Sequence, residues 1–379
     1  MKYDVISADG HVDLIWLPPD LFTKNASAAL KERMPHVVEG PKGPEWVSAK
    51  GAKFGLVNGM GSAGREYVPG VIYRSDRMAS TGLYNDGKKG VRRLTDPALR
   101  LKDQERDGVQ AEILYGILGS SGRLNDPEAA LEMLRIYNDW LHDFCKAAPD
   151  RLIGLANIPN YNMEESVAEM WRNAKRGVLG FDVANRPDMT PLWDPFWEPL
   201  WQCAHETGIP VHFHTIGGRS PDTSKMPPYV VRRVQAAHIT NFQMHMSYML
   251  MSLIYSGAPE RHPNLKVVIG EAGIGWIPYV LQHMDLEWED QFKDLDLKMK
   301  PSEYWYRQFY ATYQTDPIGV RLLDVLGEDN VMWGSDYPHP DGIWPDSQEF
   351  LDRELAGVNA ETRRKITRDN ALKLYRLGN

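Results

Sequence analysis

The chain has 379 residues, of which 42% are hydrophobic and 25% are charged, an ordinary balance for a globular protein. Its net charge of -8 and isoelectric point near 5.8 argue against a nucleic-acid-binding protein, which usually has a basic surface. No apolar run is long enough to span a membrane and the first residues lack a signal-peptide pattern, so a cytoplasmic location is expected. The two cysteines, Cys145 and Cys203, are expected to be free, buried thiols.

Short apolar or β-branched runs alternate with longer segments of helical spacing along the chain. Strands are expected at 3–11, 111–116, 151–159, 178–184, 209–215, 265–273, 308–314 and 330–338. Helices are expected at 96–108, 126–148, 163–177, 194–208, 230–257 and 274–292, in DPIGVRLLDVLG and near the C-terminus. Eight strands, each followed by a helix, predict an α/β fold of the (β/α)8 TIM barrel type. The barrel is expected to be a single domain over residues 1–379. An open, doubly wound sheet is the alternative, but its glycine-rich fingerprint is absent after the first strand.

The segment 14–95 is far longer than an ordinary connection between a barrel strand and its helix. It contains WLPPDLF, the glycine-rich run FGLVNGMGSAGREYVPG and several arginines. An insertion at this point of a barrel lies on the C-terminal face, where active sites are built. We therefore expect residues 14–95 to form a lid or a pocket wall over the mouth of the barrel.

Acids and histidines stand at the ends of four predicted strands. The first strand ends in Asp9-Gly-His11, the fifth contains His212-Phe-His214, the sixth contains Glu271, and VMWGSDYPH in the eighth presents Asp336. Residues two apart on a strand point to the same side, and the strand ends of a closed barrel converge on one mouth. Imidazoles and carboxylates gathered in this way predict a divalent-metal site.

Each of these features has a simpler explanation when it is taken alone. The Asp-x-His pair could be a turn with a capping aspartate, and the fifth-strand histidines could be ordinary core residues. Glu271 could begin a helix, since acids favour helix N-termini. His339 could simply be a residue that packs beside Pro338. Because four separate strand ends carry residues of the ligand type, packing is the weaker explanation of the set.

Five stretches of the sequence resemble one known family: ADGH, PVHFH, VIGEAGIGWIPY, WGSDYPH and DNALKLY. They are similar to the amidohydrolase-related family, in the branch that includes aminocarboxymuconate-semialdehyde decarboxylase and γ-resorcylate decarboxylase. The resemblance spans the whole chain and is strongest at WGSDYPH. It implies a (β/α)8 barrel with one divalent metal ion, with zinc expected first and manganese second. The members are hydrolases or non-oxidative decarboxylases, and they are often dimers.

The resemblance also implies which residues hold the metal. Asp9 and His11 match the ligands of the first strand. His214 matches the fifth-strand ligand, because it is the last histidine before the loop. Asp336 matches the eighth-strand acid, which binds the metal and handles protons.

Two positions depart from the family pattern and bear on the reaction. Glu271 stands where many of the decarboxylases have a histidine, and Asp13 stands where some relatives have a second histidine. An ionised glutamate would repel a substrate carboxylate but could accept a proton from a metal-bound water. The first expectation is therefore a hydrolase acting on a small cyclic or aromatic substrate. Asp336 or Glu271 would serve as its base, and His212 and Glu271 would orient water, substrate or leaving group.

Two other functions remain open at this point. The runner-up is non-oxidative decarboxylation of an aromatic carboxylate, and the third is a non-enzymatic barrel with a degenerate metal site. Substrate contacts are expected from His339 and from loop arginines, which in other proteins are often simply solvated. These arginines are Arg65, Arg74, Arg77 and Arg219. The expected partners are a small-molecule substrate and further copies of the chain, as a homodimer or larger homo-oligomer, without nucleic acid or membrane.

Overall fold

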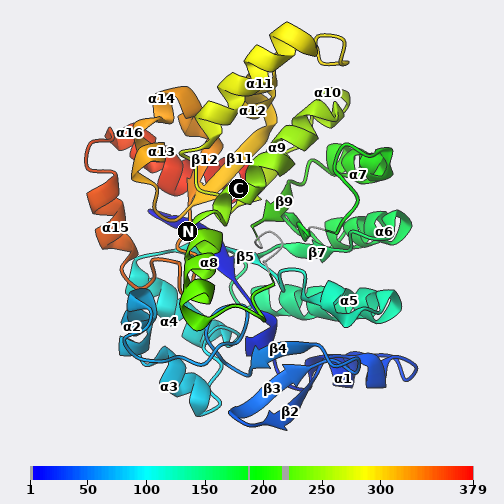
Figure 1. The fold of residues 1–379 in the computed structure, drawn as a ribbon, viewed down its shortest axis with the longest axis vertical. Helices are drawn as coiled ribbons and strands as arrows, with labels where there is room; N and C mark the ends of the chain where they lie inside the picture. Colours follow the sequence, from blue (N-terminus) through cyan, green and yellow to red (C-terminus); the bar gives the residue numbers. More distant parts are fainter. Residues whose placement is uncertain (1–2, 187, 216–221, 379) are drawn as a thin grey trace.

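The structure, a computed structural model, describes residues 3–186, 188–215 and 222–378. Parallel strands form a barrel with helices packed around it (Figure 1). The strands of the barrel are β1 (Ile6–His11), β5 (Ala111–Tyr115), β6 (Leu152–Gly154), β7 (Ala156–Ile158), β8 (Phe181–Val183), β9 (Val211–His214), β10 (Val267–Gly270), β11 (Phe309–Tyr313) and β12 (Val331–Trp333). Each of the eight predicted runs contains a strand, and the prediction of a TIM barrel is confirmed.

Two seams complete the ring of strands. Strands β6 and β7 are two halves of one predicted run, divided at Leu155, which bonds to β5 on one side while Ala156 bonds toward β8 on the other. At the second seam, the His11 N–H donates to the Tyr337 carbonyl (2.8 Å) and the Asp336 N–H donates to the Asp9 carbonyl (2.8 Å). The second seam therefore joins the first and last strands at the point where both carry predicted site residues.

Helices surround the barrel, and several begin where the sequence supplies a cap. The side chains of Asp96, Asp126 and Asn162 accept hydrogen bonds from backbone N–H groups in the first turns of their helices. The helices that follow the 14–95 segment are α4 (Pro97–Asp107), α5 (Pro127–Cys145), α6 (Met163–Ala174), α7 (Glu198–Thr207), α8 (Pro228–Thr240), α9 (Met246–Tyr255), α10 (Ala258–Arg261), α11 (Ile277–Gln291), α12 (Pro301–Gln308), α13 (Pro317–Arg321), α14 (Leu323–Leu326), α15 (Ser347–Glu354), α16 (Ala360–Arg364) and α17 (Asn370–Tyr375).

The single helix expected over 230–257 is wrong, because the chain forms two helices there. Helix α9 buries Met249, Leu250 and Leu253 in the core, whereas α8 buries none of its residues. A short 3-10 turn at Gln243–His245 separates them. The apolar spacing carries through the turn, but only the second half of the run faces the barrel.

Between β1 and α4 the chain forms a small unit of its own. It contains an antiparallel sheet of β2 (His36–Gly40), β3 (Gly43–Val47) and β4 (Lys53–Leu56), with helices α1 (Leu21–Asn25), α2 (Tyr73–Ser80) and α3 (Leu83–Lys88). Trp46 and Phe54 of this unit belong to the same buried cluster as Tyr137 of α5 and Tyr337 after β12. The unit therefore shares its core with the barrel instead of enclosing a separate one.

The barrel interior is filled by side chains and closed at one end by the C-terminal helix. Ile6, Ile113 and Met332 from the strands pack with Leu374 and Tyr375 of α17. The opposite end, where the strands finish, carries the acids and histidines.

A buried ion pair supports the first barrel strand from outside. Arg100 of α4 is fully buried, and it donates to Glu112 of β5 (2.8 Å) and to the backbone carbonyl of His11 (2.9 Å).

Arg100→Ala should lower the free energy of unfolding by about 3–5 kcal/mol, because it leaves the Glu112 carboxylate buried without its cation. Chemical denaturation measures the change. Arg106→Ala, at an exposed position of the same helix, should shift stability by no more than about 0.5 kcal/mol. Equal effects of the two substitutions would contradict this account.

Candidate metal centre

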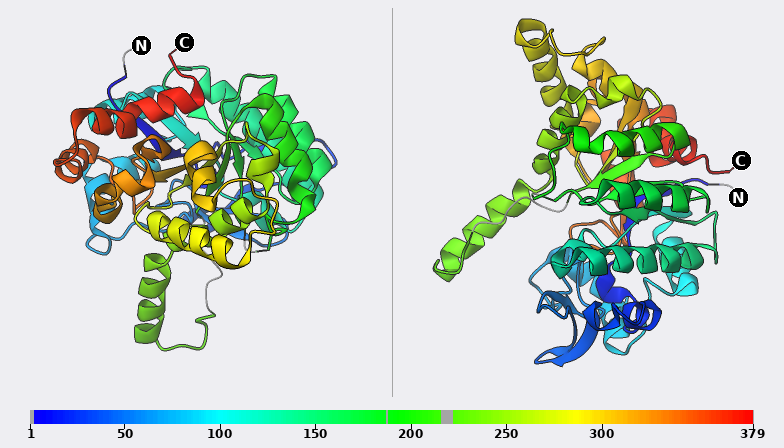
Figure 2. Two further views of the ribbon diagram at one scale, coloured as in Figure 1. Left: turned by 90° about the horizontal axis from the view of Figure 1, so that it is seen from above. Right: turned by 90° about the vertical axis from the view of Figure 1, so that its right-hand side faces the viewer.

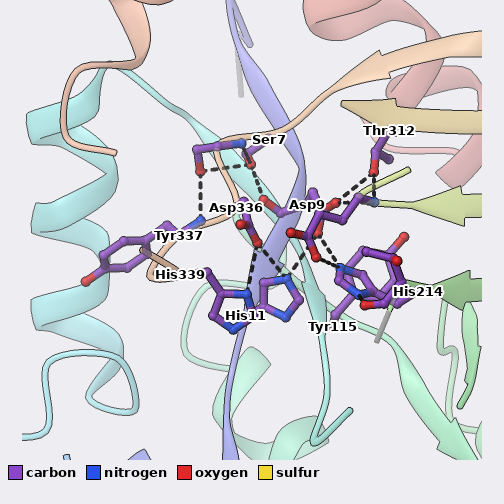
Figure 3. A network of polar contacts seen from close by, with 12 residues as sticks. Ser7, Asp9, His11, Tyr115, His214, Thr312, Asp336, Tyr337 and His339 are labelled. Carbon is purple, nitrogen blue, oxygen red and sulfur yellow. Dashed lines mark hydrogen bonds and ion pairs between the residues drawn. The ribbon is translucent and has the colours of Figure 1, made fainter. Parts of the chain in front are cut away.

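Three strands bring four predicted ligands together at the mouth of the barrel (Figure 3). Asp9 and His11 come from β1, His214 from β9, and Asp336 from the loop after β12. One ligand atom from each lies within 4.8 Å of the others, and all four side chains are buried. The His11 Nε2 atom is 3.0 Å from the Asp336 Oδ1 atom and 3.3 Å from the Asp9 Oδ1 atom. The sequence prediction that these four residues converge matches the geometry.

The seam between β1 and β12 fixes the relative positions of the two aspartates. The Ser7 hydroxyl donates to the Asp9 carbonyl (2.8 Å) and accepts from the Ser335 N–H (2.9 Å), which ties the two chain segments together. A side chain at Gly334 would come within 2.3 Å of the Asp9 Cβ atom, so only glycine permits this close approach. Asp336 has a φ of 57°, in the left-handed region, which marks a strained site held by its surroundings.

Hydrogen bonds orient Asp9 so that one of its oxygens stays open. Its Oδ2 atom accepts from the Thr312 hydroxyl (2.7 Å) and from the Glu271 N–H (2.9 Å). Its Oδ1 atom is buried and has no hydrogen-bond donor among the described residues. Although burial raises the pKa of Asp9, the neighbouring His214 and His11 hold it well below the ordinary value. Asp9 is thus an ionised carboxylate with one free oxygen facing the other ligands.

The ring of His214 is oriented in the same way. Its Nδ1 atom lies 2.7 Å from the Thr215 carbonyl, which can only accept, so Nδ1 carries the proton. Its Nε2 atom is buried, lacks a hydrogen-bond partner among the described residues, and lies 3.4 Å from the Asp9 Oδ1 atom. This arrangement leaves the Nε2 lone pair available to a metal ion.

The donor set fits a single divalent ion. Buried polar atoms without a partner are rare in folded proteins, and here four of them face one another: Asp9 Oδ1, His11 Nε2, His214 Nε2 and Asp336 Oδ1. Two carboxylates and two neutral imidazoles would balance the charge of one divalent cation. Mixed nitrogen and oxygen ligands suit zinc and manganese alike.

A second row of side chains adjoins this cluster. The His339 Nδ1 atom lies 3.1 Å from Asp336 Oδ1, and its Nε2 atom lies 3.1 Å from Asp13 Oδ2. The ring stacks on His11 at 3.9 Å between centroids. Burial lowers the pKa of His339, but Asp13 and Asp336 outweigh burial and raise it well above the ordinary value. His339, predicted as a substrate contact, therefore bridges two carboxylates.

Glu271 lies at the edge of the cluster, 3.7 Å from the His214 Nε2 atom, with a φ of 49°. Its burial, and the proximity of Asp336, raise its pKa well above the ordinary value of a glutamate. The hydrolase expectation depends on an ionised Glu271 that repels a substrate carboxylate. Enclosure among other acids disfavours that charged form, so repulsion by Glu271 is a weak reason to expect a hydrolase.

His212 lies away from the ligand cluster. Its Nδ1 atom is 3.0 Å from the Tyr115 hydroxyl, and its ring stacks against Tyr375 of α17. Burial lowers its pKa to about 3. The expectation that His212 and His214 share one cavity failed because the barrel interior is layered. His212 lies one layer deeper, toward the end that α17 closes, and a role in orienting water or substrate has no support from this position.

The predicted arginines differ in their surroundings. Arg74 is half-buried, donates to the Gly342 carbonyl (2.8 Å) and lies over the Phe350 ring, close to the loop that carries His339. Arg77 pairs with Asp346, and Arg65 is exposed. Arg219 lies outside the described residues.

Thr312 is a site residue that sequence reasoning missed. It is the inward-facing residue of β11, and its hydroxyl joins Asp9 to the backbone of Glu271. The strand QFYATYQ was predicted, so its alternation could have indicated an inward hydroxyl at this position, but nothing in the sequence linked it to Asp9.

Removing the Thr312 hydroxyl should weaken metal binding without unfolding the protein. Thr312→Val leaves Asp9, a predicted ligand, with one hydrogen-bond donor fewer, and loss of such an outer partner typically costs about 10–100-fold in metal affinity. Titration with Mn²⁺ measures the change, with Thr312→Ser as the matched control that keeps the hydroxyl. Equal Mn²⁺ affinity in the valine and serine variants would contradict the role given to this hydroxyl.

The family sequence model described as Amidohydrolase matches residues 92–377. The chain belongs to the amidohydrolase family. Its curated relatives include 2-amino-3-carboxymuconate-6-semialdehyde decarboxylase from Dictyostelium discoideum, 25% identical over 74% of this chain and 77% of the relative. They also include γ-resorcylate decarboxylase from Rhodococcus jostii, 26% identical over 74% of this chain and 87% of the relative.

Solved structures share the fold of this amidohydrolase family member. The 5-carboxyvanillate decarboxylase from Sphingomonas paucimobilis has a TM-score of 0.69 at 20% identity, covering 99% of this chain and 100% of the other. A 5-carboxyvanillate decarboxylase from Novosphingobium aromaticivorans, solved with manganese and 3-methoxy-4-hydroxy-5-nitrobenzoic acid, has a TM-score of 0.64 at 23% identity. It covers 79% of this chain and 92% of the other.

These comparisons correct two expectations. The prediction of a hydrolase is contradicted, because the relatives are named as decarboxylases of carboxylated substrates. The preference for zinc is not supported, since manganese is the metal named with the solved neighbours. The expectations of an enzyme and of a buried metal-binding site agree with the findings. No helix in the described part of the chain is long and apolar enough to cross a membrane.

Proposed function

We propose that this protein is a metal-dependent, non-oxidative decarboxylase of an aromatic carboxylate. The observation that carries the proposal is the set of four buried, unpartnered ligand atoms from Asp9, His11, His214 and Asp336 at the mouth of the barrel. The family membership and the names of the relatives support this reaction over hydrolysis. The resident ion would be manganese, as in the solved neighbours.

The metal ion would bind the substrate, and the side chains around it would hold the metal ion. A bound divalent ion would supply positive charge that holds the oxygens of the aromatic acid. Asp9 and the two histidines would hold the ion, with Thr312 fixing the direction of Asp9. These side chains are buried, which would keep bulk water away from the reacting groups.

The reaction needs a proton donor as well as a binding site. When the bond between the ring and the carboxylate breaks, the electron pair stays on the ring carbon, carbon dioxide leaves, and a proton must reach that carbon. We assign delivery of this proton to Asp336, which would receive it from the protonated imidazole of His339, 3.1 Å away, and pass it to the ring carbon. Asp13, on the far side of the imidazole, would hold the His339 ring in place.

The segment 14–95 would form one wall of the substrate pocket within a single domain over 1–379. Its support is contact with the loop after β12: Arg74 donates to the Gly342 carbonyl, and Gly61 lies against Pro340. Arg74 would present its guanidinium to the anionic substrate, since it is half-buried beside the loop that carries His339.

A chelation experiment tests the proposed function. The protein is stripped with a chelator, reloaded with Mn²⁺, and incubated with a panel of hydroxylated benzoates while carbon dioxide is measured. The Mn²⁺-loaded protein should release carbon dioxide from at least one acid, and the stripped protein should not. Release that is unaffected by chelation, or hydrolysis of esters and lactones without any release from the acids, would overturn the proposal.

A further inference from the structure

The segment 222–245, here called the arm, extends from the mouth face of the barrel. Figure 2 shows α8 standing clear of the other helices, on the side opposite the chain ends. No residue of α8 is buried, and none of its residues belongs to the buried clusters or packs against them. Isolated helices of about 12–15 residues are marginal in water. A helix of this length that projects alone is therefore expected to pack on another surface.

The exposed side of the arm is both apolar and basic. Tyr229 and Ile239 are each 63% exposed, and they lie on the same side of α8 as Arg232 and Arg233. Arg232 contacts Gln235, Arg233 lies over the Tyr229 ring, and no carboxylate among the described residues pairs with either arginine. Three basic residues against one acid give the arm a positive charge on a chain whose net charge is -8.

Helix α11, on the same molecule, has the opposite character. Its outward side exposes Tyr279 (71%) and Leu286 (64%), with Glu289 and Asp290 at the end of the same side. The helix contains four acids and no lysine or arginine. Exposed apolar side chains next to acids form a surface complementary to the arm, with its exposed apolar side chains next to arginines.

We propose that the arm of each protomer packs against helix α11 of a second copy of the chain, forming a symmetric dimer. In a two-fold dimer the same contact occurs twice, with arm on α11 and α11 on arm. The charges favour a second copy because the basic arm meets an acidic helix that every copy carries. The arm emerges from the chain that follows β9, the strand of His214, so the interface lies on the mouth face of both barrels.

Two charge-reversed variants test this contact. The arm variant is Arg232→Glu/Arg233→Glu, and the helix variant is Glu289→Lys/Asp290→Lys. Each variant alone places like charges at both contacts, so its dimer dissociation constant should rise about tenfold or more. An equimolar mixture should form a heterodimer, because each reversed side then meets an opposite charge at both contacts. Sedimentation velocity across a concentration series measures all three samples.

Controls separate the contact from general effects of charge and folding. Lys88→Glu/Lys89→Glu makes the same change of charge on exposed residues elsewhere and should leave the dimer unchanged. Circular dichroism and bound Mn²⁺ should match the wild type in every variant. The helix variant also loses the exposed ion pair between Glu289 and Lys300, which should change the stability of the fold very little.

Three results would overturn the proposal. Both variants could dimerise alone as tightly as the wild type, or their mixture could fail to restore the dimer. The wild type could also stay monomeric throughout, including a monomer that cosediments with phosphatidylserine vesicles, which would assign the basic arm to an anionic lipid surface.

Discussion

Replacing His11 or His214 by alanine is expected to remove the bound divalent ion and to abolish decarboxylation. Each substitution deletes one of four buried ligand atoms that have no other partner among the described residues, and it leaves two carboxylates facing each other. With one imidazole missing, only three donor atoms remain, too few to enclose the ion. Elemental analysis of protein purified in Mn²⁺ should show less than about a tenth of the wild-type content, since a lost ligand costs more than the 10–100-fold of an outer partner.

The matched control for these substitutions is His283→Ala, at an exposed position of α11. It should retain full metal content and activity, and all three variants should remain folded by circular dichroism. Wild-type metal content in both the His11 and the His214 variant would show that the ligands have been assigned wrongly.

Asp336→Asn is expected to lower turnover by about 100-fold or more, the usual scale for losing a positioned acid or base. The asparagine keeps the shape of the side chain and one oxygen ligand, but it cannot carry a proton to the ring carbon. Metal content should fall much less than in the His11 variant, so the loss should appear in the turnover number of the metal-loaded enzyme. Single-turnover kinetics with a reactive aromatic acid measures it directly.

A comparison with Asp13→Asn distinguishes proton transfer from ring positioning. Asp13 contacts His339 but is not one of the four predicted metal ligands. Asp13→Asn should therefore reduce turnover less than Asp336→Asn. If Asp336→Asn turned over substrate at the wild-type rate with metal bound, the assignment of Asp336 as proton donor would be wrong.

The fold could be predicted because each barrel strand is a short apolar run bounded by polar residues. The stretch VMWGSDYPH shows how far this extends: the buried strand and the acid that follows it are both indicated by the local sequence. The convergence of Asp9, His11, His214 and Asp336 could be predicted because parallel strands place their ends together. That inference requires only the strand assignment and the residue types.

The features that could not be predicted depend on how deep a side chain lies in the barrel and on which residues surround it. His212 and His214 lie on one face of one strand, but which layer borders the mouth is set by the whole barrel. The raised pKa of Glu271 follows from its burial and from its enclosure by Asp336 and other acids, which the sequence does not show. The division of the 230–257 segment into α8 and α9 depends on which half faces the core.

The most direct test of the central claim follows the atoms of the substrate. The Mn²⁺-loaded protein is incubated in D₂O with an aromatic acid labelled with ¹³C in its carboxylate, and the products are measured by mass spectrometry and NMR. The account predicts labelled carbon dioxide in equal amount to an arene that carries one deuterium at the vacated ring position. An unchanged carboxylate, with solvent oxygen instead incorporated into a hydrolysed product, would contradict it.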